Sequence, residues 1–147
     1  MPAATALDAV DVGQFAHMPT ASGLLYSRAI VRAGLGRREE AADDLRRCGA
    51  TMEALRWRNP TILPWRSALA GVIAAHELDG ARTLVAEELE LARTSGQPRA
   101  IGRAMYGLAL LEDPVDVEGL RAAVAELERS PGRLELARAL TDLGAAL

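Results

Sequence analysis

The alternation of apolar and polar positions is clearest from Asn59 to Arg93. After Pro64, apolar side chains recur every three or four residues, the spacing of one face of a helix. A short polar run interrupts this face, and a second stripe with the same spacing follows. We therefore predict two helices joined by a tight turn over 60–95, with Asn59 and Asp79 as N-caps. The two stripes comprise Trp65, Leu69, Val72, Ile73, Ala81, Leu84, Val85, Glu88, Leu89 and Ala92, with Glu87, Glu90 and Arg93 outward.

A similar pair precedes this stretch. The pattern over 20–56 predicts a first helix capped by Thr20 or Ser22 and a second helix with a clean apolar stripe that includes Cys48. A reactive thiol needs a basic and exposed setting. We therefore interpret Cys48 as a small buried core residue.

Two further segments follow. The residues 98–129 predict another helix pair, and 131–147 predict a terminal helix with Ser130 as its N-cap and a proline at its first position. Gly96 suits the end of the preceding helix. Residues 1–19 show weak periodicity, and we expect them to be loosely ordered.

The helix pairs repeat. Residues at comparable places in the first helices lie about 37–40 residues apart, and most of them are small: Ala29, Leu69, Gly107 and Gly144. The spacing of Tyr106-Gly107, Gly119 and Pro131 matches that of a tetratricopeptide repeat. The sequence thus predicts an all-α fold of about seven helices, stacked as antiparallel pairs in a short right-handed tetratricopeptide-like solenoid.

Composition agrees with close-packed helices. Half of the residues are apolar, but only 3% are aromatic, and Ala and Leu supply most of the apolar content. The net charge of −3 and the lack of a basic stripe argue against direct contact with nucleic acid. No apolar run approaches the length of a membrane span, and a single cysteine excludes an internal disulfide. We expect a cytoplasmic location.

The sequence of residues 23–147 resembles that of a known family. The runs that carry the resemblance are Arg58-Asn59-Pro60, Leu63-Pro64-Trp65-Arg66-Ser67, Glu87-Glu88-Leu89-Glu90-Leu91-Ala92-Arg93, Gly96-Gln97-Pro98-Arg99-Ala100-Ile101-Gly102-Arg103-Ala104, Ser130-Pro131, Leu134-Glu135, Ala137-Arg138-Ala139-Leu140 and Asp142-Leu143-Gly144-Ala145-Ala146-Leu147. They are similar to the helical-repeat arm of the large ATP-binding LuxR-type transcriptional regulators of actinobacteria, relatives of the maltose-operon activator. The resemblance implies a segment that receives a signal and biases a switch module.

The other modules of that family have no counterpart in these residues. The sequence contains no G-x-x-x-x-G-K-[ST] motif, and it contains no recognition helix of a helix-turn-helix. We therefore expect a non-catalytic sensor or protein-interaction segment that receives a small effector or a protein partner. The alternatives are a free-standing tetratricopeptide-like adaptor for a partner peptide, and a small-molecule-binding helical domain with a pocket near Trp65.

Candidate chemistry is sparse. His17 and His76 are isolated from each other and from further ligands, so we predict neither a metal site nor a cofactor. Three neighbouring glutamates, Glu87, Glu88 and Glu90, resemble paired carboxylates. The simpler interpretation is a solvated helix face, and the sequence predicts no catalytic residue.

Candidate partner contacts lie on the first helices of the pairs, which line the concave face in this class of repeat. We predict Trp65, Arg66, Arg99, Arg103 and Tyr106 as concave-face residues that meet an acidic ligand or peptide. Trp65, together with Trp57, has a structural alternative, in which the two rings seal the junction between two repeats. Apolar stripes at the ends of the stack also suggest self-association.

Overall fold

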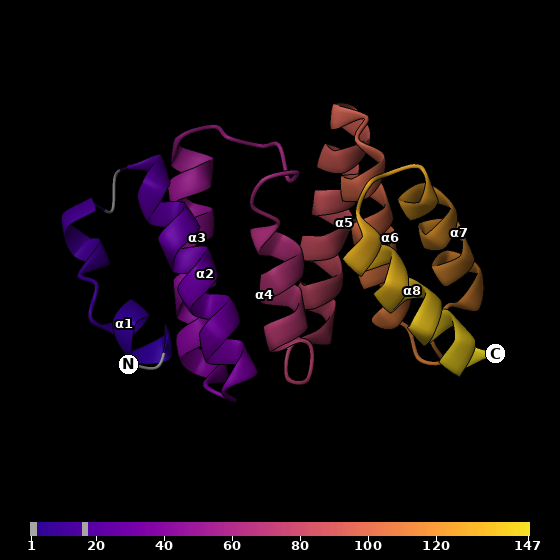
Figure 1. Ribbon diagram of the computed structural model, residues 1–147, viewed down its shortest axis with the longest axis horizontal. Coiled ribbons are helices and arrows are strands. Elements are labelled where there is room, and N and C mark those ends of the chain that lie inside the picture. The colour runs from indigo at the N-terminus through magenta and orange to yellow at the C-terminus, as the bar shows by residue number, and fades with distance from the viewer. Residues whose placement is uncertain (1–2, 16–17) are drawn as a thin grey trace.

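The computed structural model describes residues 3–15 and 18–147, and all the regular structure in these ranges is helical. Figure 1 shows the helices side by side in a row, with α1 at one end and α7 and α8 at the other. The elements are α1 (Ala3–Asp8), a 3-10 turn η1 (Val12–Phe15), α2 (Pro19–Gly34), α3 (Arg38–Ala54), α4 (Trp65–Ile73), α5 (Leu78–Ser95), α6 (Pro98–Leu110), α7 (Val117–Glu128) and α8 (Arg133–Ala146). The predicted all-α fold is confirmed.

The helices pack as consecutive pairs. Helix α2 packs on α3, α4 on α5 and α6 on α7, and each pair also contacts the next one through sequence neighbours. The first helices touch as well, because α2 contacts α4 and α4 contacts α6. The seven predicted helices correspond to α2 through α8, and α1 is an additional short helix.

Several predicted boundaries follow from local backbone chemistry. Gly96 ends α5 in the left-handed conformation at φ 67°, and Pro98 opens α6 two residues later. The Asp116 carboxylate accepts a hydrogen bond from the Gly119 N–H at 3.0 Å and caps α7. Glycine tolerates positive φ, and a carboxylate satisfies an unpaired N–H at a helix start, so these ends are set within a few residues of chain.

Other predicted caps are wrong. Helix α2 begins at Pro19, so Ser22 lies buried inside the helix instead of capping it. The N-cap of α5 is Glu77, and Asp79 follows within the helix. Proline at a first helical position explains the early start of α2, because its fixed φ suits a helix and its missing N–H needs no partner there.

The first helix of the second pair and the last helix also begin later than predicted. Helix α4 starts at Trp65, and the Asn59 side chain accepts from the Thr61 N–H at 2.9 Å in a separate turn. Helix α8 has Gly132 as its N-cap, while the Ser130 hydroxyl accepts from the Gly132 N–H at 3.2 Å. In both places a polar side chain serves a tight local turn rather than the helix itself.

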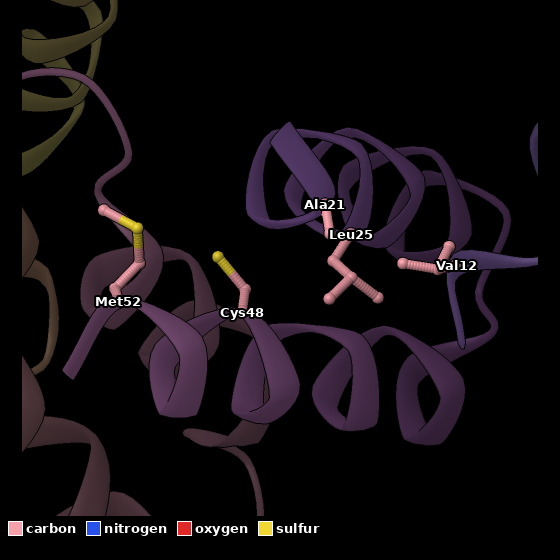
Figure 2. Packing of buried hydrophobic residues seen from close by; sticks show 5 residues of the cluster. All are labelled: Val12, Ala21, Leu25, Cys48 and Met52. Atoms are coloured by element: carbon pink, nitrogen blue, oxygen red, sulfur yellow. The ribbon is translucent and has the colours of Figure 1, made fainter. Parts of the chain in front are cut away.

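The core is a chain of small clusters along the stack rather than a single centre. Figure 2 shows the first of them, in which Ala21 and Leu25 of α2 face α3 beside Val12, with Cys48 and Met52 on α3. Cys48 is fully buried, and burial raises the pKa of its thiol to about 11. The interpretation of Cys48 as a core residue is confirmed.

Some close helix approaches fall at the repeat positions and others do not. A Cβ on Gly107 of α6 would lie 3.3 Å from Val85 of α5. A Cβ on Gly102 of α6 would lie 2.7 Å from Leu127 of α7, and one on Gly49 of α3 would lie 2.6 Å from the Trp65 ring. A Cβ on Gly144 would meet nothing within 4 Å. The repeat spacing therefore locates the first helices correctly, but Gly144 does not mark a close approach.

The segment predicted as loosely ordered contains α1 and η1 in its described part. Val12 is buried in the first core cluster. The Asp8 carboxylate accepts from Arg32 at 2.7 Å and from Arg37 at 2.6 Å, which ties α1 to α2 and to the turn after it. These hydrogen bonds hold the pKa of Asp8 below its usual value, with Arg37 contributing most.

Candidate binding groove

The first helices of the three pairs, α2, α4 and α6, enclose a hollow of about 310 Å³, which we call the inner groove. It opens where α2 and α6 flank the shorter α4. Its lining residues are Tyr26, Ile30, Pro64, Ser67, Ala68, Ala70, Gly71, Val85, Arg103, Tyr106, Gly107, Leu110 and Leu111. The groove therefore draws on all three helix pairs.

Most of the groove is apolar. Small residues of α4, Ala68 and Gly71 among them, line its middle, and a Cβ on Gly71 would meet nothing within 4 Å. Two large apolar side chains, Ile30 of α2 and Leu110 of α6, are 47% and 39% exposed. Apolar surface of this kind, open to solvent in a hollow, is typical of a ligand site.

Arg103 supplies the only formal charge in the lining. Its Nη2 donates to the Pro60 carbonyl at 2.7 Å, and its Nε lies 3.8 Å from the Glu88 carboxylate, too far for a hydrogen bond. Burial lowers the pKa of the Arg103 guanidinium, and the Glu88 charge opposes that shift. Arg103 thus lies at the groove with only part of its donor capacity used.

Glu88 is buried beneath this site, as its place on the inward stripe of the helix predicted, and the interpretation of it as part of a solvated face is wrong. It is 1% exposed, and its two oxygens accept from the Ser67 hydroxyl at 2.6 Å and the Ser67 N–H at 3.0 Å. Its neighbours Glu87 and Glu90 are exposed, as predicted. A buried carboxylate is stable only with such partners, and the main one comes from α4, far from Glu88 in the sequence.

Tyr106 also lines the groove, but its hydroxyl is occupied elsewhere. It donates to the Asp142 carboxylate of α8 at 2.5 Å. Burial and this hydrogen bond raise the pKa of Tyr106 to about 12. Arg99 lies outside the lining and pairs with Glu135 at 2.5 Å, which again joins α6 to α8.

Two of the predicted concave-face residues, Arg66 and Trp65, do not line the inner groove. The Arg66 guanidinium contacts Glu53 of α3 and lies 3.4 Å from Glu87 of α5, over the Trp65 ring at 4.4 Å. The Trp65 ring covers Gly49 and packs on the first two core clusters. Trp65 therefore fits the structural interpretation, whereas Trp57 is 41% exposed.

The groove residues that the sequence did not predict include Tyr26, Ile30, Ser67 and Gly71. Their spacing along the sequence could have identified them. Tyr26 and Ile30 are four residues apart on α2, and Ser67 and Gly71 are four apart on α4, about one repeat later. Positions that recur at the repeat period on the first helices identify this face without reference to residue type.

Other hollows are lined by charged side chains. One beside α3 and the turn after α4, with a volume of about 370 Å³, includes His76 among charged neighbours. Among the described residues, no cluster of His, Cys, Asp or Glu is arranged to hold a metal ion. The other histidine, His17, lies outside the described residues.

Comparisons with known proteins do not identify the chain. No family model, curated protein or solved structure matches it. In the described ranges, no helix has the length and apolar character needed to cross a membrane. The ligand and the role of the groove therefore follow from the chemistry of its lining residues alone.

Proposed function

We propose that this chain is a non-catalytic sensor or protein-interaction segment of a LuxR-type transcriptional regulator. The inner groove receives an effector or a partner, and binding biases a switch module elsewhere in the regulator. The observation that carries the proposal is the apolar groove formed by three helix pairs of a helical repeat. The resemblance of residues 23–147 supplies the regulator family.

The contacts beneath the groove support a sensing role. Arg103 of α6 holds the Pro60 carbonyl in the loop between α3 and α4, and it lies next to Glu88 of α5. A ligand that contacts α2, α4 and α6 together acts on the spacing of all three pairs. It biases a switch only if it binds the two arrangements of those pairs with different affinity.

The location and the assembly of the protein are part of the proposal. We place it in the cytoplasm, acting on a protein partner or a small effector and not touching nucleic acid or membrane through this segment. Its α8 end exposes Leu134, Leu140 and Leu147, a surface suited to self-association. Light scattering across micromolar concentrations tests this point, and a monomer throughout would contradict it.

The main test is the mass of the endogenous protein. An antibody to this segment should detect in the native host a band several times larger than 15.6 kDa. In that larger protein, Gly71→Leu should change the response of a transcriptional reporter without lowering protein abundance. A band near 15.6 kDa would favour the free-standing adaptor, and turnover by the purified chain would exclude a non-catalytic role.

A further inference from the structure

Two hydrogen-bonding groups at the inner groove have no partner within the described part of the chain. Arg103 uses Nη2 for the Pro60 carbonyl, and neither Nη1 nor Nε, which lies 3.8 Å from Glu88, makes a hydrogen bond. The Tyr26 hydroxyl likewise makes none. Both side chains line the same groove.

The remainder of the groove offers only apolar contact. From these two donors the lining continues over Ala68 and Gly71 of α4, with Ile30 on one side and Leu110 on the other. A ligand that fits must therefore accept hydrogen bonds at one end and be apolar along its body.

We infer that the inner groove binds a small carboxylic acid with an apolar body. Its carboxylate accepts hydrogen bonds from Arg103 Nη1 and the Tyr26 hydroxyl, and its body lies over Ala68 and Gly71. This inference rests on the part of the proposed function that makes the groove the receiving site. It adds the class of ligand and the two side chains that recognise it.

Charge selects the head group. Arg103 repels an ammonium group. A neutral alcohol does not gain the charge-assisted hydrogen bond that a carboxylate gains. Glu88 lies 3.8 Å from Arg103 and already balances much of its charge, so a dianion such as a phosphate monoester is disfavoured. A monoanion gains the charge-assisted hydrogen bond from Arg103 and adds less uncompensated charge than a dianion.

Volume limits the body of the ligand. The groove holds about 310 Å³, at the lower end of the range for small-molecule sites. A short aliphatic chain or a single ring fits this space better than a long-chain lipid. Octanoate is therefore a suitable probe.

The first experiment titrates octanoate, 1-octanol and octylammonium into the full 147-residue chain by isothermal titration calorimetry. Octanoate should bind at least about tenfold more tightly than 1-octanol, the effect of one charge-assisted hydrogen bond, and octylammonium should not bind. Equal affinity for octanoate and 1-octanol would overturn the inference, as would the absence of octanoate binding at millimolar concentration.

A matched pair of tyrosine variants tests the site. Tyr26→Phe removes a hydroxyl that has no hydrogen bond in the described fold, and it should weaken octanoate binding about tenfold. Tyr106→Phe removes a hydroxyl of the same groove that is directed to Asp142, so the octanoate affinity should stay within about twofold. Equal effects of the two substitutions would overturn the assignment of Tyr26.

Two further variants test the head-group and body positions. Arg103→Met should abolish the preference for octanoate over 1-octanol. Gly71→Leu places a side chain into open space within the groove and should block both ligands while the fold is retained. Undiminished octanoate binding by Gly71→Leu would overturn the inference even if Arg103→Met did not fold.

The inference and the proposed function fail in different ways. Octanoate binding that requires Tyr26, combined with a reporter that ignores both octanoate and Gly71→Leu, would sustain the ligand class and contradict the regulatory role. A reporter that responds to Gly71→Leu, combined with a groove indifferent to the octanoate carboxylate, would sustain the role and overturn the ligand class.

Discussion

Arg28 and Arg103 are both largely withdrawn from solvent, but their surroundings differ. Arg28 of α2 donates from Nε and Nη2 to the two oxygens of Asp44, at 2.8 and 2.7 Å. Arg103 of α6 makes one hydrogen bond, to a backbone carbonyl, and no hydrogen bond to its nearest carboxylate. Hydrogen bonding to Asp44 raises the pKa of Arg28, whereas burial lowers the pKa of Arg103.

The difference separates a structural charge from one available for binding. A guanidinium that donates two hydrogen bonds to one carboxylate joins two helices and has few donors left for a ligand. A guanidinium with unused donors, set in an apolar hollow, gains most from an incoming acceptor. Arg28 in the α2–α3 pair is therefore fully paired with a carboxylate, whereas Arg103 at the groove still has unpaired donors.

The largest predicted effect on stability follows from breaking the ion pairs of Asp44. Asp44→Asn leaves Arg28 without its buried carboxylate and removes a contact to Arg32. We expect the free energy of unfolding to fall by about 3–5 kcal/mol, measured by urea denaturation. Asp43→Asn, one residue earlier and exposed, is the control and should have no measurable effect. A loss below about 1 kcal/mol for Asp44→Asn would remove the contrast with the groove.

Replacing the buried carboxylate beneath the groove with an amide should lower the free energy of unfolding by less. Glu88→Gln retains an oxygen for Ser67 but removes the charge near Arg103. We expect a loss of about 1–2 kcal/mol by the same measurement. Glu90→Gln on the exposed face of α5 is the matched control. A loss as large as that of Asp44→Asn would show that the two regions are equally dependent on their charges.

Two glycines compare a closed helix contact with the open groove. Gly102→Ala places its Cβ 2.7 Å from Leu127 and 3.1 Å from a backbone oxygen of α7, so we expect it to destabilise the fold by about 1–3 kcal/mol. Gly71→Ala meets nothing and should stabilise it by about 0.5–1 kcal/mol, because alanine favours a helix. Thermal unfolding of both variants gives the sign, and a common sign would contradict the packing described for α6 and α7.

The smallest effect concerns α1 and depends on pH. Because hydrogen bonds from Arg37 and Arg32 lower the pKa of Asp8 below 3.8 in the folded chain, attachment of α1 is favoured above that pH. It is lost as the pH falls through the folded pKa. Amide chemical shifts of α1 should move in this range by NMR as the Asp8 carboxylate is protonated. In Asp8→Asn the α1 shifts should already be displaced at neutral pH, and unchanged shifts would show that other contacts hold α1.

The order and number of the main helices were predictable because their signals are local. Apolar spacing of three and four residues identified α2 through α8, and Gly96, Pro98 and Asp116 placed boundaries close to those observed. The misplaced caps Ser22 and Asp79 lie inside helices whose N-caps, Met18 and Glu77, make no side-chain cap hydrogen bond. A search for polar capping residues does not find helix starts of this kind.

The site was less predictable because it depends on pairing between distant residues. The spacing placed Glu88 on the inward stripe of its helix, but its partner Ser67, on another helix, was not predictable from the sequence. Arg66 and Arg103 occupy equivalent-looking places on first helices, yet one is directed to Glu53 and Glu87 and the other to the groove. The direction of a long side chain follows from its ion-pair partners, which the repeat pattern does not encode.

The burial of Cys48 has a practical consequence. The chain has no other cysteine, and this thiol is enclosed with a pKa of about 11, so thiol-directed reagents have no accessible target in the folded protein at neutral pH. A fluorophore or spin label can therefore be attached through one cysteine introduced at the groove, without first removing the native one. The wild-type sequence is already a suitable background for distance measurements across its helix pairs.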